Sequence, residues 1–353
     1  MYAQFSMKRF FLLLLILLPV AAAGHCRKEK APEVACELHY NADGKFKILQ
    51  LTDTHFIAGD PRSERALQNI NAVLDAEKPD FVIHTGDIIF GNPADESARQ
   101  ALQPLVDRGI PFAVVLGNHD SDFSLTRSEM YDLVRATPGN VNTPADTSAL
   151  FGYSNDIITL SGAKGPEHVF YLFDSGSYDT VAGIKGYGYI RANQIDWYRR
   201  ASAYFTGKNG GKPVPSVAFF HIPFPEYTLA LHGDPKKGRA VVGNYGEEPC
   251  PPKFNSGLYL AMRECGDVFA TVTGHDHDND FVMLWQGFLM IYGRFSGCDT
   301  VYNHLKPNGA RVFEFTEGDD GVRTWIRLSD GRTEQELYLF PQMKTLSETK
   351  KDQ

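Results

Sequence analysis

Two kinds of segment alternate in the N-terminal part of the chain. Apolar runs rich in β-branched and aromatic residues have the length of buried strands and lie at 46–53, 81–87 and 111–120. The two stretches between them, 63–80 and 94–109, carry apolar residues at helical spacing. Alternating strands and helices predict parallel strands joined by right-handed crossovers. The chain is therefore expected to form an α/β fold.

The remainder of the chain is richer in predicted strands. Neighbouring strands of a second sheet are expected at 151–162 and 168–176, and a polar, Gly- and Pro-rich loop is expected at 232–253. No internal repeat or low-complexity linker is present, so one domain is the simplest organisation. The other predicted elements are helices at 191–205 and 255–265 and strands at 215–224, 268–280, 287–295, 310–317 and 322–330.

The N-terminus has the pattern of a targeting segment. Lys8 and Arg9 precede the apolar run FFLLLLILLPVAAAG, and Ala21 and Ala23 occupy the small-residue positions of a cleavage site. This pattern predicts a signal peptide at 1–23 and export to the periplasm, the cell exterior or the cell surface. The alternatives are a buried helix and a membrane anchor, but the run is short for a membrane span, and none is expected in the mature chain.

The cysteines are expected to be structural, because no C-x-x-C pattern indicates a thiolate zinc site. An exported chain can form disulfides, and the candidate pairs are Cys250 with Cys265 and Cys26 with Cys36. Cys26 closely follows the apolar run, so a lipid anchor there is an alternative, although His25 is an unfavourable residue before a lipidated cysteine. The odd total leaves at least one cysteine unpaired or modified; the five are Cys26, Cys36, Cys250, Cys265 and Cys298.

The charge balance narrows the range of partners. A net charge of −8, from 35 Lys and Arg against 43 Asp and Glu, and the lack of a long basic block argue against a nucleic-acid-binding surface. A small phosphorylated substrate stays open, because a bound metal can hold phosphate. The domain boundaries expected are an N-terminal extension at 24–44, a main domain at 45–341 and a charged, flexible tail at 342–353.

Polar clusters follow five of the predicted strands. Each has an ordinary explanation alone, since Asp caps helices, GD and GN form turns, and a lone histidine is commonly a hydrogen-bonded, half-buried residue. Ligands of open α/β sheets, however, bind beyond the carboxyl ends of strands, so these clusters can converge on one crevice. The clusters are Asp53 and His55 in DTH, Asp87 in GD, Asn118, His119 and Asp120 in GNHD, His221 in HIP, and His275 and His277 in GHDH.

The residue types in these clusters fit a site for two metal ions. Mixed imidazole and carboxylate ligands favour Mn, Fe or Zn, as divalent or trivalent ions, over Ca or Mg. One carboxylate must bridge ions about 3.5–4 Å apart. Asp87 is the best candidate, because it follows a strand alone, between the other groups. Two ions also acidify a shared water, so no protein nucleophile is needed, and no G-x-S-x-G is present.

The ordered set D-x-H, GD, GNHD, H and GHDH resembles the calcineurin-like metallophosphoesterase superfamily, which includes the purple acid phosphatases. The resemblance covers residues 46–316, nearly the whole mature chain. It implies a four-layer α/β/β/α sandwich of two mixed sheets flanked by helices. It also implies the metal ligands. The first metal would be bound by Asp53, His55 and His277, and the second by Asn118, His221 and His275. Asp87 would bridge the two.

The same resemblance implies a role for His119, which would contact the substrate phosphate and protonate the leaving oxygen, with Asp120 orienting it. The implied activity is that of an exported, dinuclear metal-dependent phosphoesterase. It would hydrolyse phosphomonoesters, or diesters, by attack of a metal-bound hydroxide. Two alternatives remain: a phosphodiesterase or nucleotidase that scavenges nucleotides, and a non-catalytic protein that binds a phosphorylated ligand.

The sequence departs from the purple enzymes at two positions. Those enzymes carry an iron-binding tyrosine three residues after the GD aspartate, where this chain has Phe90, and the first site here has His55 where they carry a different residue. A tyrosinate-to-iron colour is therefore not expected. The stretches GYGYI, QIDWYRR, FHIPFPEY and GHDHDNDF resemble a purple-phosphatase-like subgroup that lacks this tyrosine.

Further polar residues near the strand ends have two interpretations each. Asp278, Asn279 and Asp280 are expected to be solvated turn residues, with Asp278 or Asn279 as an alternative partner of a ligand imidazole. Other residues are candidates for the pocket lining, with ordinary packing as the alternative; these are Tyr187, Tyr189, Tyr227, Arg191 and Arg294.

Overall fold

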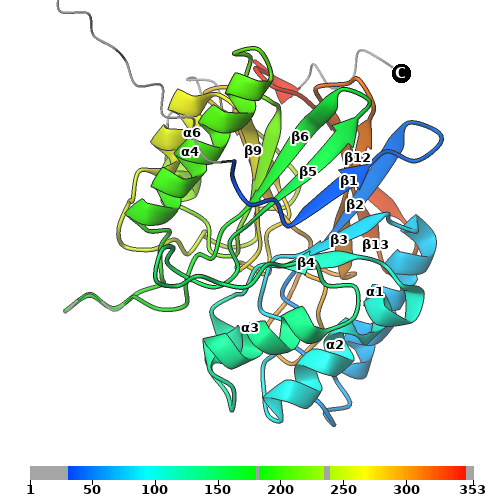
Figure 1. Cartoon of the computed structure of the whole chain (residues 1–353). Helices are drawn as coiled ribbons and strands as arrows, with labels where there is room; N and C mark the ends of the chain where they lie inside the picture. Colours follow the sequence, from blue (N-terminus) through cyan, green and yellow to red (C-terminus); the bar gives the residue numbers. More distant parts are fainter. Residues whose placement is uncertain (1–30, 180, 182, 234–238, 347–353) are drawn as a thin grey trace, which may run out of the picture. The chain divides into compact units, whose positions relative to one another are not determined.

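The computed structural model describes residues 31–346 apart from 180, 182 and 234–238 (Figure 1). The expected signal peptide at 1–23 and the candidate lipidation site Cys26 lie outside these residues, and the expected tail at 342–353 is described only as far as Leu346. In the part of the chain that is described, no helix is long and apolar enough to cross a membrane.

Two mixed β-sheets lie at the centre of the fold. The smaller sheet has the order β14 (Thr333–Leu339), β13 (Val322–Leu328), β12 (Gly309–Thr316), β2 (Lys45–Leu51), β3 (Phe81–His84) and β4 (Phe112–Val114). The larger sheet has the order β1 (Cys36–His39), β5 (Asp156–Gly162), β6 (Gly165–Leu172), β7 (Ser216–Phe219), β9 (Val268–Thr273), β11 (Phe288–Tyr292), β10 (Val282–Trp285) and β8 (Arg239–Val242). Strands β2, β3 and β4 are parallel, which confirms the pairing predicted from the alternation.

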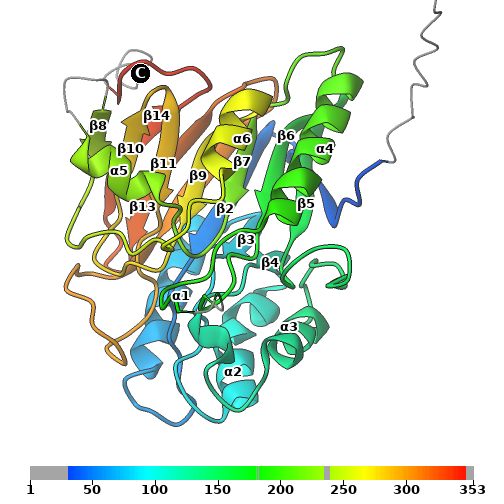
Figure 2. The same ribbon diagram turned by 90° about the vertical axis from the view of Figure 1, so that its left-hand side faces the viewer.

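Helices cover the outer face of each sheet, as Figures 1 and 2 show. Apolar side chains form three clusters, one between the sheets and one beneath each group of helices, so the molecule has the four layers α/β/β/α that the family resemblance implies. The smaller sheet is covered by α1 (Glu64–Glu77), α2 (Ala94–Arg108) and α3 (Arg127–Ala136), and the larger by α4 (Ala192–Lys208), α5 (Glu226–His232) and α6 (Leu258–Cys265).

Strand β2 illustrates how the sequence builds these layers. Phe46 and Ile48 belong to the cluster between the sheets, while Leu49 and Leu51 pack beneath the helices. Because successive side chains of a strand point to opposite faces, a strand that is buried on both sides must be apolar throughout. Lys45 and Lys47 are only partly buried, so Gln50 is the one fully buried polar residue of β2, and its amide donates to the Thr273 carbonyl at the end of β9 in the other sheet (3.1 Å). This bond ties the two sheets together where their strands end.

Several short elements were missed by the sequence analysis. Strand β8 lies inside the segment expected to be a polar loop, and β1 lies in the expected N-terminal extension, where it pairs parallel to β5. Both are edge strands of four residues, too short to give a clear periodic signal. The expected boundary at 341 is also wrong, because Met343 and Leu346 are buried in the cluster between the sheets. The remaining missed elements are β10, β14, α3 and α5.

The cysteine pairing left open by the sequence is not formed in the described residues. Among the described residues, Cys36, Cys250, Cys265 and Cys298 are free, which contradicts the candidate bond between Cys250 and Cys265. Cys26, the candidate partner of Cys36, lies outside the described residues. Burial raises the pKa of the Cys36, Cys250 and Cys265 thiols, which makes them poor thiolates at neutral pH.

Met343 provides a test of the corrected boundary. Met343→Ala should lower the free energy of unfolding by about 2–5 kcal/mol, because a buried side chain leaves a cavity when it is truncated. Leu260→Ala is the matched control, since Leu260 is 57% exposed and its truncation opens no cavity. Urea unfolding of both variants measures the difference. Equal stabilities would show that the segment after 341 does not belong to the core.

Candidate metal centre

The carboxyl ends of strands from both sheets meet at one place. Asp53 follows β2, Asp87 follows β3 and Asn118 follows β4, while His221 and His275 follow the adjacent strands β7 and β9 of the other sheet. These side chains are all buried. The structure thus brings together residues that the sequence places more than 200 positions apart, at the edge where α/β sheets bind ligands.

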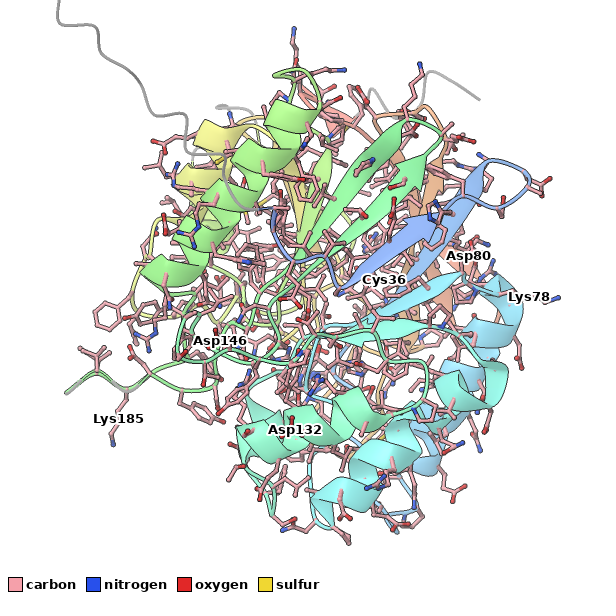
Figure 3. The ribbon with its side chains drawn as sticks, in the orientation of Figure 1. Cys36, Lys78, Asp80, Asp132, Asp146 and Lys185 are labelled. Atoms are coloured by element: carbon pink, nitrogen blue, oxygen red, sulfur yellow. The ribbon has the colours of Figure 1, made fainter. Side chains whose placement is uncertain are left out.

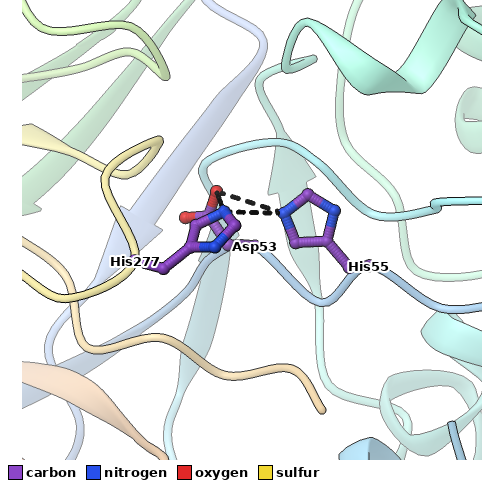
Figure 4. Close-up of side chains that lie close together, drawn as sticks. All are labelled: Asp53, His55 and His277. Carbon is purple, nitrogen blue, oxygen red and sulfur yellow. Dashed lines mark hydrogen bonds and ion pairs between the residues drawn. The ribbon is translucent and has the colours of Figure 1, made fainter. Parts of the chain in front are cut away.

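The first group of donors consists of Asp53, His55 and His277, and their side chains point toward one another (Figure 4). One ligand atom from each lies within 4.8 Å of the others. Asp53 Oδ1 is 3.8 Å from His55 Nε2 and 3.7 Å from His277 Nε2. This spacing is compatible with three donors around one ion.

The second group consists of Asp87, His221 and His275, and one ligand atom from each likewise lies within 4.8 Å of the others. His221 Nε2 is 3.2 Å from Asp87 Oδ2 and 3.3 Å from His275 Nδ1. The amide oxygen of Asn118 lies 3.1 Å from the same imidazole nitrogen. A fourth donor atom is therefore available here.

Asp87 lies between the two groups. Its Oδ2 atom is 3.7 Å from His55 Nε2 of the first group and 3.2 Å from His221 Nε2 of the second. Its other oxygen, Oδ1, accepts the backbone N–H of His119 at 2.8 Å, which fixes the carboxylate plane. The geometry is that of a carboxylate shared by two neighbouring sites.

The donor set fits metal ions by a specific feature of this structure. His55 Nε2 and His277 Nε2 lie 3.0 Å apart, a spacing at which both nitrogens can contact one metal ion at metal–nitrogen distances of about 2.0–2.1 Å. His277 and His221 donate their Nδ1–H groups to the carbonyls of Tyr302 and Thr85 (2.8 and 2.7 Å), which leaves Nε2 of each ring as the ligand atom.

The electrostatics of the site also favour cations. Burial lowers the pKa of His275 to about 3 and of His277 to about 4, so both rings are neutral and keep a lone pair for a metal. Burial opposes the charge on Asp53 and Asp87, but the surrounding imidazoles lower the pKa of both carboxyls below the usual value. Burial likewise opposes a charged His221, yet Asp87 raises its pKa to about 9, since the carboxylate stabilises positive charge beside it.

Backbone geometry at the donors is unusual. Asp53, His55, Asp87 and His275 all have positive φ, at 53°, 49°, 53° and 79°. Such conformations cost about 1–3 kcal/mol for each non-glycine residue and persist where the surroundings enforce them. Residues with this strain cluster at functional sites, so the pattern agrees with the positions of the proposed ligands.

At two of the glycines that precede donor residues, a side chain would clash with neighbouring atoms. A Cβ on Gly274 would lie 1.9 Å from Thr52 Oγ1 and 2.5 Å from Asp53 Oδ2. A Cβ on Gly117 would lie 2.1 Å from Asp87 Oδ1. The GH and GN dipeptides are therefore more than turn signals, because only glycine lets these backbones approach the carboxylates of the other strands.

The expected link between Asp120 and His119 is wrong. Asp120 is buried and accepts backbone N–H groups from Gly117, Asp87 and Ile88 at 2.7–3.0 Å, while burial and the nearby Asp87 raise its pKa. His119 Nδ1 instead lies 2.7 Å from Asp122 Oδ2. Residues 119–121 form a single 3₁₀ turn, in which positions three apart share a side, so the residue next to His119 faces away from it.

The expectation that Asp278, Asn279 and Asp280 are solvated is also wrong, because all three are buried. Asp280 pairs with the buried Arg294. Asn279 bonds Gly246 and Glu247, and Asp278 bonds His304. These residues hold other segments against the loop that carries His275 and His277. His277 Nδ1 donates to the Tyr302 carbonyl at 2.8 Å, so neither Asp278 nor Asn279 is the partner of this imidazole.

The candidate pocket-lining residues separate into two kinds. Tyr187 sits edge-on to the His275 ring, with centroids 4.2 Å apart. Tyr227 and Arg294 are buried in the core, and Arg191 stacks on Tyr189 (3.7 Å), so packing explains these four. The sequence analysis missed Tyr302, whose ring stacks on His277 with centroids 4.5 Å apart, and no motif marks that position.

Phe90 lies beside the first donor group, as its place after GD predicts. Its ring is 5.2 Å from the His55 ring and 4.9 Å from the His119 ring, between centroids. A side chain without a hydroxyl offers no ligand atom there, so oxygen coordination from this position is excluded.

Comparisons with known proteins agree with this geometry. Residues 46–279 match the calcineurin-like phosphoesterase family. The chain is 31% identical to a "Probable inactive purple acid phosphatase 29" from Arabidopsis thaliana, over 90% of this chain and 88% of that protein. It is 30% identical to "Phosphatase DCR2" from Saccharomyces cerevisiae, over 88% of this chain and 58% of that protein.

A solved structure shares the fold. The crystal structure of a dimetal phosphatase from Danio rerio aligns with 84% of this chain and 99% of its own, with a TM-score of 0.58 and 13% sequence identity. The family match spans the strands that carry all the donor residues. This chain therefore belongs to the calcineurin-like phosphoesterase family, among relatives named as purple acid phosphatases.

Proposed function

We propose that this protein is a dinuclear metal-dependent phosphoesterase that hydrolyses phosphomonoesters. The observation that carries the proposal is the pair of buried donor groups joined by Asp87, with His119 beside them. The proposed ligands of the first ion are Asp53, His55 and His277, those of the second are Asn118, His221 and His275, and Asp87 bridges the two.

The chain's own residues have distinct tasks in this proposal. The buried imidazoles and carboxylates hold their lone pairs in fixed directions, so little reorganisation accompanies reaction. When bound, two Mn, Fe or Zn ions supply an acidified water and neutralise charge on the phosphate oxygens. His119, whose side chain is 28% exposed, would contact the phosphate and give a proton to the leaving oxygen.

A non-catalytic phosphate-binding protein is the second candidate, because the Arabidopsis relative carries the words "Probable inactive" in its name. Against it stands the full set of proposed ligands together with His119 in this chain. The yeast relative is named a phosphatase, which supports catalysis. A diesterase or nucleotidase uses the same metal core, so only substrate comparison separates these activities. Export through the segment at 1–23 belongs to the same proposal.

The central prediction concerns metal content and substrate class. Elemental analysis of purified protein should give about two transition-metal ions per chain. An aryl phosphomonoester should then be hydrolysed faster than a bis-aryl diester in the presence of Mn, Fe or Zn. Faster diester hydrolysis would favour the phosphodiesterase alternative. Binding of inorganic phosphate without hydrolysis of any ester would favour the non-catalytic candidate.

Asp87→Asn tests the bridge. Both metal occupancy and activity should be lost, because the amide removes the negative charge that both sites share. Elemental analysis and phosphomonoester turnover measure the two effects. Asp132→Asn is the matched control, since Asp132 lies on α3 with its side chain 70% exposed (Figure 3). Normal metal content in Asp87→Asn would contradict the bridging role.

His119→Ala tests the proton donor. Turnover of an alkyl phosphomonoester should fall roughly 100-fold or more, since general-acid catalysis contributes at least that much. Metal content should stay near that of the wild type, because His119 is not a proposed ligand. Loss of metal from His119→Ala, measured by elemental analysis, would show that the ligand assignment is wrong.

A further inference from the structure

We propose that Asp122 is the positioning residue for His119, and that Tyr178 holds Asp122 in place; this inference rests on the proposed phosphoesterase function. Asp122 thus has the role of orienting His119 that the sequence suggested for Asp120. The three side chains form a hydrogen-bonded line at the exposed side of the buried donor groups.

The contact between His119 and Asp122 has the geometry of an orienting pair. His119 Nδ1 donates to Asp122 Oδ2 at 2.7 Å, and the backbone N–H of Asp122 donates to the His119 carbonyl at 3.2 Å. The 3₁₀ turn therefore fixes the backbones of both residues, and the carboxylate fixes the ring. With Nδ1 occupied, Nε2 is the nitrogen left to face a substrate.

A second loop secures Asp122 from the other side. The Tyr178 hydroxyl donates to the same oxygen, Asp122 Oδ2, at 3.1 Å. Tyr178 forms an antiparallel bridge with Tyr187, and the N–H of Asp179 donates to the carbonyl of Gly186 at 2.8 Å. Lys185, shortly before Tyr187 in the chain, lies away from the body of the fold (Figure 3).

The segment that contains Tyr178 and Tyr187 also contacts the donor groups. The rings of Tyr178 and Tyr187 stack with centroids 6.0 Å apart, and Tyr187 packs edge-on against His275 at 4.2 Å. Ser177 Oγ donates to the carbonyl of Asn118 at 2.9 Å. Residues 177, 178 and 187 thus contact both proposed metal ligands and the partner of the proposed proton donor.

A purely structural explanation of the pair is weak. The His119 and Asp122 side chains are 28% and 29% exposed, and ion pairs with that exposure contribute little to stability. The His119 backbone is already held by Asp87 Oδ1. The carboxylate of Asp122 is therefore expected to contribute little to stability, and its main effect is on the direction of the imidazole.

Proton donation by His119 affects the rate of hydrolysis differently for different leaving groups. Water adds to phosphorus, the bond from phosphorus to the ester oxygen breaks, and the proton on His119 Nε2 passes to that oxygen, giving an alcohol and inorganic phosphate. The attacking water loses one proton as it adds to phosphorus, and that proton, passed through the solvent, restores His119. An alkoxide needs this proton to leave, whereas 4-nitrophenolate leaves without it. The positioned histidine therefore suits phosphomonoesters of aliphatic alcohols.

The test compares two substrates in the metal-loaded, full-length protein. Asp122→Asn should lower kcat for an alkyl phosphomonoester roughly 10-fold or more while changing kcat for 4-nitrophenyl phosphate by less than about two-fold. Metal content should not change. Tyr178→Phe should give a smaller loss in the same direction, because it removes the hydroxyl and keeps the ring stack.

A double-mutant cycle separates positioning from a general structural effect. In the His119→Ala background, Asp122→Asn should have no further effect, since residues that act through one another are not additive. Equal losses on both substrates, or an additive loss in the double variant, would overturn the role of Asp122. If the wild type hydrolyses neither substrate, the proposed function itself fails. Asp132→Asn, on the exposed face of α3, is the control for both arms.

Discussion

The buried carboxylate of Asp87 is the constraint on which the rest of the structure depends. An ionised group with almost no exposure is stable only when positive or hydrogen-bonding partners surround it. Its partners here are imidazoles from strand ends of both sheets and the backbone N–H of His119. The two sheets must therefore end at one point, and the α/β/β/α layering is the arrangement that brings their carboxyl ends together.

Other buried polar residues hold the loops that follow these strands in place. Asp120 gathers the N–H groups that follow β3 and β4, and Arg127 donates to the carbonyls of Leu116 and Gly117 while pairing with Asp174. Asp280 and Arg294 perform a similar task beneath the loop after β9. The acids around the histidines thus divide into those facing the centre and those bonded to the supporting loops. Only distances in the folded chain distinguish the two sets.

The sequence predicted the proposed ligands better than their surroundings, for a physical reason. Each ligand follows a strand, and the end of a parallel strand fixes where its next residue lies, so position alone suffices. Asp122 depends on which way side chains point in a 3₁₀ turn, and the neighbouring Asp120 was chosen wrongly for that reason. Asp278 to Asp280 look like a solvated turn because burial of such residues depends on partners far away in the chain. Met343 was assigned to a tail because its charged neighbours outweigh one apolar side chain in any local average.

In the proposed function, metal binding and turnover rest on different parts of this molecule. The donor groups are buried, and the strands that end at them belong to the cores of the fold, so losing a donor affects the folded chain as well as the reaction. His119, Asp122 and Tyr178 lie at the partly exposed side and are joined by one contact within a 3₁₀ turn and one contact between loops. Such contacts can be lost at little cost to stability. A chain of this fold can therefore keep its metal donors while losing its activity, and the state of the His119 environment is the better guide to catalysis than the completeness of the donor set.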